Sequence, residues 1–170
     1  RNVFDLVVTD KQGRPLPVQR LEKHRWKVTT QGRPFKVQHT VFAYDPGVRA
    51  AYLDTNRAVL NGTSLFFYVE GHVQRACTLH IDAPKGWATS VALPSRAGRH
   101  FAESYDELVD SPCAVGKHQR IRFKERGVPF EIAWMGPSNA DMKRVVEGVK
   151  KIVRTTAKIF VDKKIDPNGR

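Results

Sequence analysis

The spacing of apolar residues changes near residue 137, and this change limits the possible folds more than any other feature. Before it, short apolar runs alternate with polar residues between Gly and Pro signals, as at Phe35, Val37, His39 and Val41. A period of two places alternate side chains on one face of a strand. We therefore expect residues 1–136 to form a mainly β domain with a β-sandwich-like build.

After residue 137 the apolar residues recur at spacings of three and four, which is typical of an amphipathic helix of five or six turns. Ser138 or Asn139 is the expected N-cap. Asp141 would lie in the first turn, where the helix dipole favours a negative charge. Lysines and arginines occupy the opposite face. The apolar positions expected to face a partner surface are Met142, Val145, Val146, Val149, Ile152, Val153 and Phe160.

Three further elements are expected within the β region. The continuous apolar run Leu65–Val69, entered through a turn at Asn61-Gly62, suits a strand that is covered on both faces. Residues 101–112 suggest a short helical turn, and residues 120–135 a hairpin with Gly127 in its turn. The hairpin's expected core side chains are Ile121, Phe123, Phe130, Ile132 and Trp134.

The charge balance leaves two kinds of partner open. The chain carries 29 Lys and Arg against 17 Asp and Glu, a net charge of +12, which suits an acidic surface or nucleic acid. The basic residues are spread along the chain without regular interleaving with aromatic residues, so a solvated basic surface is the favoured interpretation and nucleic-acid binding is not expected. A stand-alone binding module for an acidic partner is the main alternative function.

The sequence also bears on location. No apolar run approaches the roughly 18 residues that a membrane span needs, so no membrane partner is expected. Two cysteines, Cys77 and Cys113, make no disulfide framework. The first residues do not read as a signal peptide, and we expect a cytoplasmic protein. Because the chain begins at Arg1 inside a strand-like run, we expect it to be cut from a longer protein.

A search for catalytic motifs finds none. There is no H-E-x-x-H pair, no G-x-S-x-G elbow and no phosphate-binding glycine loop. The carboxylates of Glu103, Asp106, Glu107 and Asp110 crowd one segment, where they suit either an acid/base pair or the caps and solvated side of a turn. The second interpretation is favoured, and no catalytic residue or metal ligand is expected in this chain.

Longer stretches of the sequence carry a resemblance. "VFAYDPGVRAAYLDTNRAVLNGTSLFFYVEGH", "CTLHIDAPKGWATSVALP", "FAESYDELVDSPCAVGKHQRIRFKERGVPFEIAWMG" and "DMKRVVEGVKKIV" occur in this order. Together they resemble the amino-terminal region of the glycyl aminopeptidase family of zinc metallopeptidases. The resemblance covers essentially the whole chain.

The resemblance implies a β-rich domain that precedes a thermolysin-like zinc domain and a PDZ-like module. Residues 1–136 would be this β-rich domain, truncated at its start, and residues 137–170 the first helix of the peptidase domain. The family's zinc ligands would follow Arg170, so the parent would need zinc while this chain would hold no cofactor. We expect the chain alone to be inactive, and the parent to remove residues from the amino terminus of peptides.

The same resemblance points to residues that could face the substrate cleft. They cluster in loops of the best-matching segments, and their alternative roles are turn formation and capping. The candidates are Tyr52, Asp54, Asn61, Thr63, Asp110 and Ser111. A separate expectation concerns the terminal helix, whose apolar face could drive self-association of the fragment.

Overall fold

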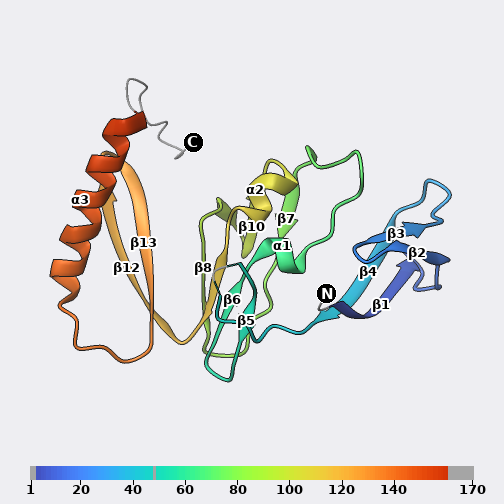
Figure 1. Ribbon diagram of the computed structural model, residues 1–170, viewed down its shortest axis with the longest axis horizontal. Coiled ribbons are helices and arrows are strands. Elements are labelled where there is room, and N and C mark those ends of the chain that lie inside the picture. Colours follow the sequence, from blue (N-terminus) through green and yellow to red (C-terminus); the bar gives the residue numbers. More distant parts are fainter. Residues whose placement is uncertain (1–2, 48, 161–170) are drawn as a thin grey trace.

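The computed structural model describes residues 3–47 and 49–160, and in Figure 1 they form three successive blocks from right to left. The first block holds two antiparallel pairs, β1 (Val3–Asp10) with β4 (Phe35–Val41) and β2 (Val18–Glu22) with β3 (Arg25–Val28). In β4 the half-buried side chains of Val37, His39 and Val41 alternate with exposed ones. The period of two is therefore confirmed in this strand.

The middle block contains two sheets. One has the order β5 (Tyr52–Leu53), β6 (Arg57–Leu60), β11 (Cys113–Gly116), β8 (Ala88–Val91). The other has the order β7 (Cys77–Leu79), β10 (Arg99–Ala102), β9 (Ser95–Arg96). All their pairings are antiparallel. Two short helices, α1 (Gly62–Leu65) and α2 (Tyr105–Val109), lie beside these sheets (Figure 1).

Both sheets and α2 supply one hydrophobic core, as the two layers of a sandwich do. Cys113 on β11 is its most buried member, with 2% of its surface exposed, and burial raises the pKa of its thiol to about 11. The mainly β class is thus confirmed. The buried core residues are Ala58, Leu79, Leu93, Ala102, Leu108, Cys113 and Val115.

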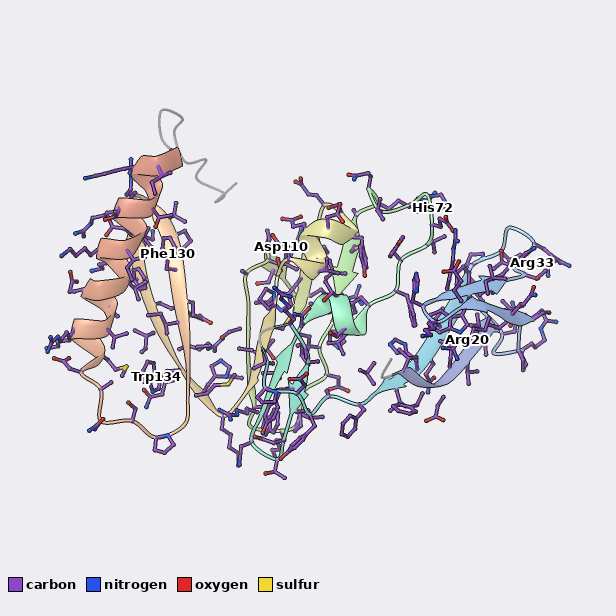
Figure 2. All side chains as sticks on the ribbon, viewed as in Figure 1. Arg20, Arg33, His72, Asp110, Phe130 and Trp134 are labelled. Carbon is purple, nitrogen blue, oxygen red and sulfur yellow. The ribbon has the colours of Figure 1, made fainter. Side chains whose placement is uncertain are left out.

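The third block, the hairpin–helix unit, comprises β12 (His118–Glu125), β13 (Val128–Met135) and α3 (Met142–Phe160). Arg126 and Gly127 form the turn with φ of 52° and 85°, the conformation that two-residue hairpin loops prefer. Both the hairpin and the terminal helix are confirmed. Phe130 and Trp134 lie along the hairpin beside α3 (Figure 2).

Aromatic stacking joins the two strands of the hairpin, and an ion pair joins the hairpin to α3. Phe123 and Phe130 stack across the hairpin with their ring centroids 5.3 Å apart, and both are half-buried. Arg154 of α3 donates two hydrogen bonds to the carboxylate of Glu125, at 2.8 and 2.9 Å. The five expected hairpin core side chains lie on the face of the hairpin that carries α3, and all five are half-buried.

Two details of α3 differ from the expectation. The N-cap is Asp141, whose Oδ1 accepts hydrogen bonds from the backbone of Lys143 at 2.9 Å and Arg144 at 3.3 Å, so neither Ser138 nor Asn139 caps the helix. Ile152 is 65% exposed, because the helix turns it away from the hairpin. Ile159 is also exposed, and self-association through this side of α3 stays a prediction. The side chain of Phe160 lies outside the described part of the chain.

The expected strand at Leu65–Val69 is wrong. Leu65 ends α1, and residues 66–69 have no regular structure, with Val69 half exposed. The carbonyl of Leu65 lies 2.9 Å from Nε2 of His39, and the carbonyl of Phe66 accepts from the Tyr105 hydroxyl at 2.9 Å. Side chains from distant segments therefore contact these carbonyls, which a strand would offer to a neighbouring strand.

Within residues 3–47 and 49–160, no helix is both long enough and apolar enough to cross a membrane.

Candidate functional site

The six candidate cleft residues fall into two groups, one at each end of β6. Tyr52 and Asp54 lie at the turn that leads into Arg57, and Asn61 and Thr63 follow Leu60. A four-residue strand separates its ends by roughly 10 Å. The six residues therefore do not meet in a single constellation.

Asp54 organises the first group. Its Oδ1 accepts hydrogen bonds from the backbone of Asn56 at 2.7 Å and Arg57 at 2.9 Å, and its Oδ2 accepts from the Tyr52 hydroxyl at 3.0 Å. The hydrogen bond from the Asn56 backbone is the main reason that the pKa of Asp54 is lowered. The bond to Asp54 raises the pKa of Tyr52. These contacts hold the turn between β5 and β6.

Asn61 and Thr63 form the start of α1. The Asn61 side chain accepts from the backbone of Thr63 at 3.1 Å and from its hydroxyl at 2.6 Å, which is an N-cap. Gly62 between them is buried, and a Cβ there would lie 2.8 Å from Cα of Val109. This close approach brings the start of α1 against the end of α2, and so places Asn61 and Thr63 near Asp110 and Ser111.

Asp110 and Ser111 close α2. The Ser111 hydroxyl donates to the carbonyl of Glu107 at 2.8 Å, and only 9% of Ser111 is exposed. The backbone of Asp110 donates to the carbonyl of Asp106 at 3.0 Å. At the other end of α2, the Ser104 hydroxyl accepts from the backbone of Glu107 at 3.1 Å. Ser111 thus has a helix-closing contact, whereas the Asp110 carboxylate lies at an open surface.

That surface is a groove of about 540 Å³ along α2. We call its four carboxylates the acidic corner, and Figure 2 labels Asp110 at the upper side of the middle block. These carboxylates lie together on a chain of net charge +12, and such a group suits a cation such as an ammonium. The acidic corner consists of Glu103, Asp106, Glu107 and Asp110.

A second hollow, of about 400 Å³, lies where the middle block meets the hairpin, and His118, Lys117 and Trp134 line it. Beside it, Nε2 of His118 lies 2.8 Å from the Ser90 hydroxyl, which donates to Oε1 of Glu131 at 2.5 Å. The other oxygen of Glu131 accepts from Nε of Arg122 at 2.6 Å. No sequence pattern marks these four residues, which meet only through the fold.

Comparison with known proteins decides the family. The profile described as "Peptidase M61 N-terminal domain" matches residues 1–117. The chain belongs to this family. The matched part of this M61 domain ends at Lys117, one residue before β12 begins.

The fold of the M61 chain is also that of a solved protein. A crystal structure of an aminopeptidase N family protein from Idiomarina loihiensis matches with a TM-score of 0.86 and 30% sequence identity. The match covers 94% of this chain and 28% of that one, so this chain spans little more than a quarter of its structural relative. A search of curated proteins found no match.

The side chains that the structure describes in the M61 chain do not provide a zinc site. Structural and catalytic zinc sites take three or four His, Cys, Asp or Glu ligands about one point. Among the described residues, no group of three or more such side chains is placed to hold a metal. The thiol of Cys113 is also enclosed in the core. We therefore derive no catalytic step from these residues.

Sequence reasoning missed the capping role of Ser104. The signal was present, because Ser104 stands three residues before Glu107 in the S-x-x-E spacing of a capping box. The Glu107 carboxylate reaches back to the backbone N–H of Glu103 at 2.5 Å, close to the pattern that this motif describes. The acidic corner is therefore in part a helix start, as the favoured interpretation of its carboxylates states.

Proposed function

We propose that this chain is the non-catalytic amino-terminal part of a zinc metallo-aminopeptidase and walls the cleft in which that enzyme holds its peptide substrate. The observation that carries the proposal is the family match over residues 1–117. Similarity to an aminopeptidase N family protein supports it, because that likeness continues through the hairpin–helix unit. The hairpin–helix unit lies outside the matched family region, and α3 would open the peptidase domain.

The chemistry of the parent would lie outside these residues. Zinc would activate water and polarise the scissile carbonyl there. The contribution of this chain would be to bound the cleft and to favour substrates with a free amino terminus. The acidic corner supports this role, because its carboxylates suit the ammonium group of a peptide's first residue. A preference for glycyl substrates and a PDZ-like module in the parent rest on the family resemblance.

The absence of catalysis in the isolated chain is tested directly. We expect purified residues 1–170 to contain no stoichiometric zinc by elemental analysis and to leave glycyl and alanyl anilides intact. The reason is that the described residues offer no metal donor set. Stoichiometric zinc together with turnover would overturn the proposal for this chain.

The role of the cleft wall is tested in the full-length parent. Asp110→Asn is expected to raise KM for aminoacyl substrates several-fold with little change in kcat, since it would remove an attraction felt by bound substrate. Asp82→Asn is the matched control, because Asp82 is exposed and lies away from the acidic corner. The acidic corner is near the Cys77 end of β7, whereas Asp82 follows the Leu79 end. Equal KM values for the two variants and the unsubstituted enzyme would show that the acidic corner does not contribute to substrate binding.

A further inference from the structure

Few polar contacts fix the hairpin–helix unit on the rest of the molecule. Lys117 alone separates β11 from β12, and in Figure 1 the unit stands beside the middle block. Between described residues of the two parts, the hydrogen bonds made by side chains end on two neighbours in β8. Arg120 donates to the carbonyl of Thr89 at 3.5 Å, and Ser90 contacts both His118 and Glu131. Two of these three contacts use the Ser90 hydroxyl.

His118 and Glu131 lie on the same face of the hairpin. Glu131 pairs with Arg122, and Arg122 is four residues from His118 along β12, an even number. Glu125, which binds Arg154 of α3, lies on the other face. One face of the hairpin thus holds the helix, and the other presents a histidine and a carboxylate from two strands to a single serine of β8.

Each hydrogen bond in this cluster has a defined donor and a defined acceptor. The Ser90 hydroxyl carries one proton, and it donates to Oε1 of Glu131, which as a carboxylate can only accept. Ser90 must then accept from Nε2–H of His118. Nδ1 of His118 is buried and has no hydrogen-bond partner among the described residues. Arg122 completes the chain by donating to Oε2 of Glu131.

We propose that Ser90, His118 and Glu131 form a latch that fixes the orientation of the hairpin–helix unit on the middle block. The latch closes in one orientation, because one hydroxyl must accept from the histidine and donate to the carboxylate at the same time. In the parent, this orientation would set how the M61 domain meets the part that follows it. That consequence rests on the proposed function, whereas the latch belongs to this chain alone.

The latch is tested by measuring a distance across it. Spin labels are placed through Arg96→Cys on β9 and Lys124→Cys on β12, both exposed positions, with Cys77→Ser to remove the accessible native thiol. Cys113 is buried in the core and stays. Double electron–electron resonance between the two labels is expected to give one narrow distance distribution at neutral pH. The distribution is expected to broaden in Ser90→Ala and in Glu131→Ala.

Two controls separate the latch from general loosening. Glu125→Ala breaks an ion pair on the opposite face of the same hairpin and is expected to keep the narrow distribution. Ser90→Thr retains the hydroxyl and is expected to restore it. Folded Ser90→Ala protein with an unchanged distribution would overturn the latch, as would equal broadening in Glu125→Ala.

A second measurement needs no variant of the cluster. Long-range ¹H–¹⁵N spectra of the unsubstituted chain, recorded at about pH 8 where histidines are mostly neutral, identify the protonated ring nitrogen. The hydrogen bonds require His118 to carry its proton on Nε2. A neutral ring with its proton on Nδ1 would contradict the latch even if Ser90→Ala fails to fold.

Discussion

At the residue scale, the contact of Gly62 with Val109 is a tightly packed point of the candidate site. Gly62 has no side chain, so the backbone of α1 can approach the backbone of α2. A second residue-scale feature is Glu131. Its carboxylate accepts hydrogen bonds from Ser90 of the middle block and from Arg122 of its own hairpin. Val109 and Ser90 are both distant in the sequence from the residues that they contact, and Gly62 and Glu131 each give a measurable prediction.

Gly62→Ala is expected to destabilise the chain by about 1–3 kcal/mol, the usual range for inserting a methyl group into a filled site. The new Cβ would lie 2.8 Å from the backbone of Val109, which cannot swing aside as a flexible side chain would. Gly148→Ala in α3 is the matched control. It meets no atom within 4 Å and should stabilise by about 0.5–1 kcal/mol through helix propensity. Urea unfolding measures both, and equal midpoints would refute the packing argument.

Glu131 predicts a pH dependence. Burial raises the pKa of its carboxyl, but the hydrogen bonds from Ser90 and Arg122 lower it more, so the folded pKa lies below the ordinary value of 4.5. A lowered folded pKa gives stability that is fully present above the unfolded pKa and is lost as the pH falls through the folded pKa. The gap in Tm between the unsubstituted chain and Glu131→Gln should therefore be constant near neutrality and narrow below about pH 4.5. Thermal unfolding followed by circular dichroism at several pH values tests this, and a gap that widens in acid would contradict it.

At the element scale, α3 and the hairpin depend on each other. The helix offers its half-buried side to one face of β12 and β13, and Glu125 with Arg154 ties the two together. On its other face the hairpin has side-chain hydrogen bonds to the middle block only at Thr89 and Ser90 of β8 among the described residues. An isolated two-stranded hairpin is marginally stable in water, so the helix and its cap contribute much of the order in this unit.

The cap gives the prediction at this scale. Asp141→Ala is expected to cost about 1 kcal/mol, a typical loss for an N-cap side chain, since the backbone N–H groups of Lys143 and Arg144 lose their acceptor. Ser138→Ala is the control, because its hydroxyl accepts only from Ala140 outside the helix. Helical signal and urea midpoint are the measurements. A larger loss of stability from Ser138→Ala than from Asp141→Ala would show that Ser138, as the sequence suggested, is the N-cap.

At the scale of the whole molecule, the buried core lies almost entirely before β12. The core cluster reaches no further than Val115, and Ala157 is the one buried apolar residue that the structure describes in the hairpin–helix unit. The family match ends at the same place, at Lys117. The core cluster and the family match therefore both end before β12, and the division into residues 1–136 and 137–170 stays a prediction.

A fragment of residues 1–117 is accordingly expected to unfold cooperatively in urea, with a midpoint close to that of the full chain. Residues 118–170 alone are expected to lack a cooperative transition, because one helix on two strands buries too little apolar surface. Circular dichroism of the two fragments measures this. A folded, cooperative 118–170 fragment would show that the unit is an independent domain.

The sequence by itself determined the elements whose signal is local. The alternation in β4, the hairpin around Gly127 and the three-and-four spacing of α3 each follow from neighbouring residues, and all three are present. The mainly β class follows from such local patterns added along the chain, and the family resemblance rests on long matching segments of the sequence. For the candidate site, the sequence pointed to six residues that the fold divides between the two ends of β6, and their role at a cleft stays a prediction.

Only the tertiary structure decided how those segments meet. Residues 66–69 are apolar enough for a strand, yet Tyr105, a distant side chain, binds the carbonyl of Phe66. Gly62 lets the backbone of α1 pack closely against α2, and Ser90 of β8 has a hydrogen bond to the hairpin. The physical reason is that each of these contacts joins residues 28 to 47 positions apart, where the free energy comes from packing and hydrogen bonds that no local pattern encodes.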